Sequence, residues 1–385
     1  MKHVARQEAK NMSPTKLPRP KKLFHDAEEA DMEFALVDHQ LHSLIDEGAL
    51  CLADENVKLH HYVQPASIDL PVSGTAYLVK EKILPFKKRV ECSMLRSTCD
   101  TCRMQVKDLI GELTLEEKSL TGKGAVLLKG QSYLIYCGVI CLQKGQRGCL
   151  SPKSSIGRVD IMVRGIVDGC GLYDVVPGDG ISRELWLEIS PRSFNIRVHA
   201  GIAMTQLMIF AACNEDDAFQ TPIKSVYDDF DHSPAKSVTL HSEEGGEMCK
   251  EMCNLREDFQ SFASIEDGFE ALPTEDILDL SLTDFHHPRK FFREIFPSDQ
   301  GRLTLEKDRF YILATKERVC VPTYLSAEMV PFSHHVGELR AHYAGFFDPG
   351  FGYGREGEVK GTVGVLEIRV GTKEAHLSDH VPDMF

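Results

Sequence analysis

An internal repeat is the feature that most constrains the fold of this chain. Residues 128–134 (Leu-Lys-Gly-Gln-Ser-Tyr-Leu) resemble residues 305–312 (Leu-Glu-Lys-Asp-Arg-Phe-Tyr-Ile), and the Leu-Glu-Ile of 187–189 recurs at 366–368. The tyrosines of the first match lie 178 positions apart (311 − 133), and the glutamates of the second lie 179 apart (367 − 188). Two matches in one order, at almost one offset, indicate two tandem copies of one domain.

Each copy shows the pattern of short β-strands. In the first copy, Leu185, Leu187 and Ile189 alternate with Trp186 and Glu188, which is the period of a strand with one buried face. The 385 residues include 29 glycines and 18 prolines, and 42% are apolar. This composition favours many turns around a sizeable core. The sequence therefore predicts a mainly β protein with two tandem β domains and a few short helices.

Composition divides the chain into four parts. Residues 1–30 are polar and loosely basic, which predicts a flexible tail, and residues 31–212 predict the first β domain with a short amphipathic helix that ends near Gly48. Residues 213–275 are acidic and poor in β-branched residues, which predicts a linker or insertion. Residues 276–385 predict the second β domain, in which we expect residues 291–296 to form a short helix.

Charge and hydropathy restrict the partners and the location of the protein. The formal net charge is −14, and an acidic surface repels phosphate polymers, so we expect no nucleic-acid partner. No apolar run reaches the roughly 18 residues of a membrane span, and no secretory signal precedes the first domain. Twelve cysteines are scattered along the chain. We expect a cytoplasmic protein with reduced thiols and no membrane partner.

Polar groups that suit a phosphate are concentrated at residues 151–158 (Ser-Pro-Lys-Ser-Ser-Ile-Gly-Arg). Hydroxyls, accessible backbone N–H groups and a forked guanidinium are donors that phosphate oxygens accept. From the pattern alone, a polar turn between two strands is the more common explanation. The candidate phosphate-binding residues are Lys153, Ser154, Ser155 and Arg158.

Several motifs, in one order, resemble those of the dCTP deaminases within the dCTP deaminase/dUTPase superfamily. Residues 64–70 (Gln-Pro-Ala-Ser-Ile-Asp-Leu) resemble the signature that opens the family's barrel, and residues 153–158 resemble its phosphate motif. Residues 185–191 (Leu-Trp-Leu-Glu-Ile-Ser-Pro) resemble the strand with the catalytic Glu, and residues 200–207 resemble the closing strand. In the second copy, residues 342–352 (His-Tyr-Ala-Gly-Phe-Phe-Asp-Pro-Gly-Phe-Gly) resemble the base-binding hairpin. The chain is most similar to the family's long, duplicated bacterial form.

The resemblance implies a fold and a reaction. The fold is two tandem dUTPase-like, jelly-roll-like β-barrels, with active sites between barrels in a homo-oligomer. The reaction is hydrolysis of dCTP to dUTP and ammonia, with a Glu as general base toward the water that attacks C4 of cytosine. Glu188 and Glu367 match that Glu, although a Glu on an alternating strand is more often simply solvated. No metal is expected at the base, whereas Mg²⁺ is expected with the triphosphate.

The two copies depart from the family in complementary ways. The first keeps the phosphate motif but has Val176 where the family has an Asp before Pro-Gly. The second has Asp348 at that place, but its residues 326–331 (Ser-Ala-Glu-Met-Val-Pro) lack the second Ser and the Arg of the phosphate motif. We therefore expect a composite site, with the phosphates on the first copy and the base under the second copy's hairpin. Trp186 and Asp348 complete the candidate nucleotide-binding residues.

Other functions are excluded or stay open. A zinc-dependent cytidine deaminase needs a His-x-Glu followed by Pro-Cys-x-x-Cys. The only Cys-x-x-Cys, at 99–102, has no preceding Pro, and the only His-x-Glu, at 241–243, follows it, so we expect no catalytic zinc. The thiols Cys92, Cys99 and Cys102 leave a structural zinc open. A dUTPase, a bifunctional deaminase/dUTPase and an inactive nucleotide-binding paralogue also stay open, the last favoured by the altered closing strand after residue 379.

Overall fold

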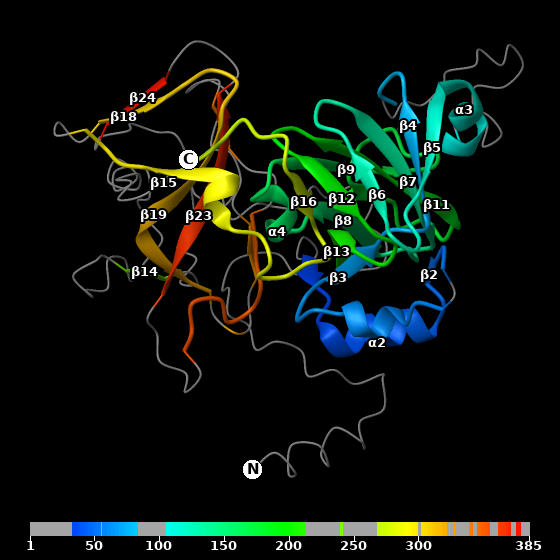
Figure 1. The fold of residues 1–385 in the computed structure, drawn as a ribbon. Helices are drawn as coiled ribbons and strands as arrows, with labels where there is room; N and C mark the ends of the chain where they lie inside the picture. The colour runs from blue at the N-terminus through cyan, green and yellow to red at the C-terminus, as the bar shows by residue number, and fades with distance from the viewer. Residues whose placement is uncertain are drawn as a thin grey trace, which may run out of the picture.

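The two halves of the chain form two groups of β-strands that lie side by side, as Figure 1 shows. The computed structural model describes residues 33–54, 56–83, 105–212, 239–241, 268–298, 302–321, 323, 326–328, 339–341, 345–354, 361–370 and 375–378. We call the described residues up to 212 the first half and those from 239 onward the second half.

Two antiparallel sheets enclose the core of the first half. One has the strand order β1 (Glu33–Ala35), β13 (Ala203–Ala212), β8 (Gln146–Pro152) and β10 (Val175–Val176), with β3 (Ile68–Pro71) also on β13. The other has the order β5 (Thr114–Ser119), β4 (Thr75–Val79), β7 (Ser132–Ile140), β11 (Arg183–Pro191) and β9 (Ile161–Val167), with β2 (Leu50–Leu52) also on β7. The short helices are α2 (Asp38–Asp46), η3 (Leu59–Tyr62), α3 (Val106–Leu113) and α4 (Ser154–Gly157).

The second half is built around one long strand pair. The strands β19 (Phe310–Cys320) and β23 (Thr362–Val370) lie within a sheet of order β17 (Phe292–Ile295), β15 (Gly268–Ala271), β19, β23 and β21 (Leu339–Ala341), with β14 (Thr239–His241) also on β19. Two smaller pairs are β18 (Arg302–Leu305) with β24 (Ala375–Ser378), and β20 (Ala327–Glu328) with β22 (Phe346–Phe347); η7 (Pro288–Lys290) precedes β17. The predicted mainly β architecture with few short helices is confirmed.

A third sheet joins the two halves. The strand β12 (Asn195–Val198) lies between β6 (Ala125–Leu127) and β16 (Ile277–Asp279), and β16 runs parallel to β12. Lys129 Nζ lies 3.0 Å from Glu275 Oε1 just before β16. At its other end, the Asp279 carboxylate lies 3.5 Å from both Arg197 and His199. A segment of the second half therefore completes a sheet of the first.

Apolar side chains from both halves also share one core. The fully buried Phe194 of the first half packs edge-to-face on Phe291 and Phe292 of the second, with both pairs of ring centroids 5.3 Å apart. Phe310 of β19 belongs to the same buried cluster. Burial of aromatic surface is a strong, non-directional driving force. It holds the halves together without fixing their relative orientation closely.

The strand registers of the two halves repeat each other. Tyr133 of β7 lies opposite Ile189 of β11, and Tyr311 of β19 lies opposite Ile368 of β23. Each tyrosine is almost fully buried, and its hydroxyl accepts a backbone N–H from the residue five positions earlier, at 2.9 Å in the first half and 2.8 Å in the second. This shared local geometry supports the duplication predicted from the sequence.

Two expectations about the second half need correction. Strands β14 and β15 fall inside the interval 213–275, predicted as a linker, yet both pair with β19. The acidic composition misled there because Glu270 is buried and accepts a hydrogen bond from Arg293 Nε at 2.8 Å. The short helix expected over residues 291–296 is wrong, because Arg293 lies opposite Glu270 in an antiparallel strand pair. Residues 213–238 and 242–267 of the interval and the tail 1–30 lie outside the described residues.

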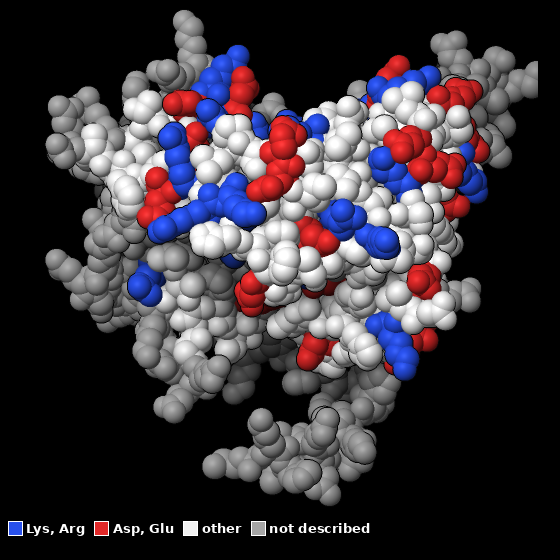
Figure 2. Space-filling model, in the orientation of Figure 1, with Lys and Arg blue, Asp and Glu red and all other residues white. Residues whose placement is uncertain are grey.

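The surface carries mixed charge on the face shown in Figure 2. Lysines and arginines lie among aspartates and glutamates over both halves on that face. A nucleic-acid-binding surface usually carries a clustered basic patch, and the described residues on this face show none. That the protein has no nucleic-acid partner stays a prediction. In the described part of the chain, no helix is long and apolar enough to cross a membrane.

The repeated tyrosine contact generates a stability prediction. Tyr133→Phe and Tyr311→Phe each remove the acceptor of a partly buried backbone N–H, so we expect each to lower the free energy of unfolding by about 0.5–1.5 kcal/mol. Urea denaturation of each variant measures the loss. Tyr136→Phe is the matched control, because its hydroxyl makes no hydrogen bond among the described residues. Equal stability of all three variants would show that the two buried hydroxyls contribute nothing.

Candidate active site

The phosphate-motif residues lie at a strand-to-helix turn. Strand β8 ends at Pro152, Lys153 is extended, and Ser154 and Ser155 begin α4 with exposed side chains. Arg158 follows α4, also exposed, and its N–H donates to the carbonyl of Ser154 at 3.0 Å. We call residues 153–158 the phosphate turn. The change from extended to helical backbone gathers its four candidate donors on one short surface element.

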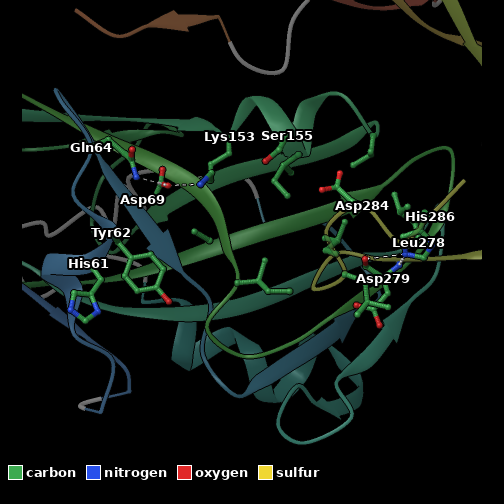
Figure 3. Close-up of a pocket in the computed structure, with 16 residues that line it drawn as sticks. His61, Tyr62, Gln64, Asp69, Lys153, Ser155, Leu278, Asp279, Asp284 and His286 are labelled. Atoms are coloured by element: carbon green, nitrogen blue, oxygen red, sulfur yellow. Dashed lines mark hydrogen bonds and ion pairs between the residues drawn. The ribbon is translucent and has the colours of Figure 1, made fainter. Parts of the chain in front are cut away.

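A buried carboxylate holds the first of these donors. Asp69 on β3 is 5% exposed; it forms an ion pair with Lys153 and accepts a hydrogen bond from Gln64 Nε2 at 3.3 Å (Figure 3). Water screens an ion pair with a buried partner only weakly, so the Lys153 ammonium is kept in place. Because Gln64 and Asp69 both belong to the motif at 64–70, that motif is part of the site.

The second half reaches the same place through Asp348. The Asp348 carboxylate accepts the backbone N–H of Ala66, and its pKa is raised by burial and by the negative charge of Asp69. Ala66 and Asp69 belong to the same motif at 64–70, so this hydrogen bond sets Asp348 against the segment that carries the Asp69–Lys153 pair. The structure therefore brings together Lys153 and Asp348, which the sequence assigns to different copies.

The local sequence shapes the loop that presents Asp348. The Phe351 N–H donates to the Asp348 carbonyl at 3.0 Å, and Gly350 has a φ of 83°. Pro349 followed by a positive-φ glycine is typical of a type II turn. In the first half, the corresponding Val176 is buried in β10 opposite Gly148. Of the two hairpins, the second therefore carries the carboxylate.

A further contact between the halves lies at the other end of the phosphate turn. Arg369 on β23 forms an ion pair with Asp160, which is fully buried and lies two residues after Arg158. The Arg369 Nε also lies 3.4 Å from Asp160 Oδ1. The second half thus brackets the phosphate turn, with Asp348 near Lys153 and Arg369 just beyond Arg158.

Glu367 lies on the same face of β23 as Arg369, because alternate residues of a strand point to one side. It is 1% exposed and lies opposite Ile312 of β19, which packs against the core of the first half. Leu366 and Ile368 are buried on the other face of the strand. Glu367 therefore faces the first half, on the strand that contacts the end of the phosphate turn.

Glu188 and Trp186 lie in different surroundings. Glu188 on β11 is 3% exposed, its Oε1 lies 3.3 Å from Lys82 Nζ, and its Oε2 has no hydrogen-bond partner among the described residues. Trp186 packs on Tyr77 and Tyr136, with ring centroids 6.3 and 5.0 Å away, in a small core that includes α3. In Figure 1, α3 and α4 lie at opposite sides of the first half. In the described part of the chain, no polar contact joins either residue to the phosphate turn.

A cavity of about 560 Å³ opens beside the phosphate turn. Lys153 and Ser155 line one side, and Asp279 and His286, from the segment around β16, line the other (Figure 3). The Asp279 N–H donates to His286 Nε2 at 2.9 Å, which orders that wall. The volume is typical of small-molecule pockets, so a ligand held by Ser155 has room beside the turn.

The carboxylates beside the turn fit a magnesium ion that arrives with a triphosphate. Asp348 Oδ1 is buried and makes no hydrogen bond within the described residues, and Asp69 lies close to it. Mg²⁺ usually takes one or two carboxylates and fills its shell with water and phosphate oxygens. Among the described residues, no group of three or more His, Cys, Asp or Glu is arranged to hold a metal. Cys92, Cys99 and Cys102 lie outside them.

Three residues that shape this site were not among the sequence candidates. Asp69 lies within the motif at 64–70, so the motif itself contained the information needed to find it. Asp160 and Arg369 are 209 positions apart, and neither lies in a recognisable pattern. Only the packing of the halves brings those two together.

Comparisons with known proteins show what the two halves of the chain are similar to. Residues 33–213 match the family model for the 2'-deoxycytidine 5'-triphosphate deaminase (DCD) N-terminal domain, and residues 234–379 match the model for the C-terminal domain. The chain is similar to the crystal structure of 2'-deoxycytidine 5'-triphosphate deaminase from Agrobacterium tumefaciens, with 28% identity and a TM-score of 0.69 over 91% of this chain and 97% of that one. A search of curated protein sequences finds no match. Both domain models are matched in order across most of the chain, which therefore belongs to the 2'-deoxycytidine 5'-triphosphate deaminase family.

Proposed function

We propose that this chain hydrolyses the 4-amino group of dCTP, giving dUTP and ammonia, at a composite site between its halves. The ion pair between Arg369 and Asp160 carries the proposal, because it sets the Glu367 face of β23 against the end of the phosphate turn. Family membership gives the substrate, and the geometry supports the choice of residues. In this view the halves are tandem dUTPase-like, jelly-roll-like barrels with unequal roles.

The phosphate turn binds the triphosphate. Lys153 supplies a fixed cation, Ser154 and Ser155 supply hydroxyl and backbone donors, and Arg158 supplies a forked guanidinium. The substrate is the Mg²⁺ complex of dCTP; phosphate oxygens and water would supply most of the ion's ligands, and the Asp348 and Asp69 carboxylates would supply the rest. Asp348 belongs to the hairpin that covers the nucleoside.

Glu367 acts as the general base. Its carboxylate takes a proton from water while the water oxygen bonds to C4, and it delivers that proton to ring N3. It then moves the remaining hydroxyl proton to the amino group, the C4–N bond breaks, and ammonia leaves. The products are dUTP and ammonia, with every proton derived from water and dCTP.

Glu188 is the less suitable base of the two. Its carboxylate is close to the Lys82 ammonium, and its strand face is shared with Trp186 in the small core beneath α3. A base must reach the water beside C4, and the phosphate turn makes no described contact with that face. We therefore assign Glu188 and Trp186 a structural role in the first half.

The oligomeric state, the location and the partners remain predictions. We expect a homo-oligomer, because family sites form between barrels, and a cytoplasmic enzyme with dCTP as substrate and dUTP as product. Neither nucleic acid nor membrane is an expected partner.

Product analysis tests the reaction. We expect purified protein incubated with dCTP and Mg²⁺ to release ammonia and dUTP in equal amounts, as measured by a coupled ammonia assay and by chromatography. Pyrophosphate together with dUMP would identify a bifunctional enzyme, and pyrophosphate from dUTP without ammonia from dCTP would identify a dUTPase. Binding of dCTP without any product would identify an inactive nucleotide-binding paralogue.

Single variants test the assignment of residues. We expect Glu367→Gln to lower kcat by about 10²–10⁴-fold with little change in dCTP affinity, which is the usual contribution of a general base. Arg158→Ala should weaken dCTP binding by about 10–100-fold through loss of a charge-assisted hydrogen bond. Loss of activity in Arg158→Ala, but full activity in both Glu367→Gln and Asp348→Ala, would return the chemistry to Glu188.

The structural role of Glu188 generates its own prediction. Lys82→Met leaves the buried Glu188 carboxylate without its cation, so we expect the free energy of unfolding to fall by about 1–3 kcal/mol, because Lys82 itself is half-exposed. Glu188→Gln added to Lys82→Met should recover most of that loss, and Glu188→Gln alone should leave ammonia release near the wild-type rate. A kcat in Glu188→Gln as low as that of Glu367→Gln contradicts this role.

A further inference from the structure

We propose that Asp160 and Arg369 are positioning residues, whose ion pair holds the strand carrying Glu367 at a fixed offset from the phosphate turn. This inference rests on the proposed function, since it concerns the geometry of the same composite site. Neither residue belongs to the motifs that resemble the family, and neither contacts dCTP in the proposed reaction.

The Asp160 carboxylate is fixed in the first half. Asp160 has no exposed surface and a left-handed backbone with φ of 57°. Its N–H donates to the carbonyl of Gly157 at 2.9 Å, and its carbonyl accepts the N–H of Arg192 at 3.0 Å. The Ser193 hydroxyl donates to Asp160 Oδ2 at 2.6 Å. The backbone and side chain of Asp160 are therefore both tied to the end of the phosphate turn.

The Arg369 guanidinium is fixed from both sides. Its Nη1 donates to the Asp308 carbonyl of the second half at 2.6 Å, and its Nη2 donates to Ser193 Oγ of the first half at 3.1 Å. Nη2 and Nε together face the two oxygens of Asp160. A two-pronged arginine–carboxylate contact specifies orientation as well as distance. A lysine cannot reproduce this geometry.

The contact suits positioning better than cohesion. Phe194 with Phe291 and Phe292, together with the pairing of β12 and β16, already holds the halves together. Replacing a buried ion pair by apolar residues is often neutral for stability, so cohesion alone does not require one here. The directional ion pair can fix the position of one half relative to the other, which the non-directional aromatic contact does not.

The positions of Asp160 and Arg369 in the sequence connect the alignment of the two halves to the proposed chemistry. Asp160 lies two residues after Arg158, and Arg369 lies two residues after Glu367 on the same strand face. A shift between Asp160 and Arg369 therefore moves the base relative to a phosphate ligand. Misplacement of a catalytic group by about 1 Å is enough to cost about 100-fold in rate.

Steady-state kinetics with dCTP and Mg²⁺ test the proposal in the full-length chain. We expect Asp160→Asn, Arg369→Gln and Arg369→Lys each to lower kcat by about 10–100-fold while KM changes by less than about threefold. Asn suits position 160 because it tolerates the left-handed backbone. The double variant Asp160→Asn/Arg369→Gln should lose no more than the worse single variant, because both changes break one contact.

Arg293→Gln is the matched control. It breaks another ion pair with a buried carboxylate, that of Glu270, whose cations Arg293 and Arg309 both belong to the second half. We expect Arg293→Gln to have a lower melting temperature than the wild type. Its kcat, measured well below that melting temperature, should be unchanged. A kcat that falls equally in Arg293→Gln and Arg369→Gln would reduce the effect to general destabilisation and overturn the proposal. A kcat in Arg369→Lys equal to wild type would also overturn it.

A readout without turnover separates this inference from the proposed function. Hydrogen exchange of the peptides covering 154–160 and 362–370 should become faster in Arg369→Gln and stay unchanged in Arg293→Gln. Unchanged exchange in Arg369→Gln contradicts the positioning contact, whatever the reaction. Faster exchange in a protein that releases no ammonia from dCTP supports the contact and rejects the proposed function instead.

Discussion

The packing of the second half's sheet onto the first half is the constraint on which the remaining structure depends. Phe291 and Phe310 are buried in a cluster whose other members are almost all residues of the first half. The face of β19 and β23 that carries Ile312 and Glu367 is covered by the apolar core of the first half. Because this apolar contact is extensive, polar groups at its margin are brought close together. The proposed composite site depends on that packing, because Asp348 and Glu367 both belong to the second half.

The two halves share a strand pair and differ in what surrounds it. Both keep the strand pair with a buried tyrosine and a glutamate in the same register. In the first half, Glu188 lies beside Lys82 and shares a small core with α3, and Val176 stands at the hairpin position. Around Glu367, the second half keeps Asp348 and its Pro-Gly turn. The proposed composite site therefore takes its phosphate donors from the first half and its hairpin carboxylate from the second.

Sequence reasoning predicted the β architecture and the duplication because both leave local traces. Alternation around Leu187 and the matched offsets of Tyr133 and Tyr311 depend on neighbours within a few residues. The helix predicted over residues 291–296 was wrong, because an aromatic run has no clear period. The strand that pairs with it, β15, also lies in a segment whose composition predicted a linker. Asp160 and Arg369 were missed for a related reason. Their meaning arises from a contact across 209 positions, and each alone is an ordinary charged residue.

The parallel pairing of β16 with β12 has a consequence for how the protein is made. Residues 277–279 complete a sheet that also contains residues 125–127 and 195–198. During synthesis the first half emerges early, and domains generally fold as they leave the ribosome. In the first half, the edge of β12 that pairs with β16 stays open until the ribosome has translated the whole interval from 213 to 276. An unpaired edge is a template for wrong partners, so the nascent chain is most vulnerable to aggregation during that interval.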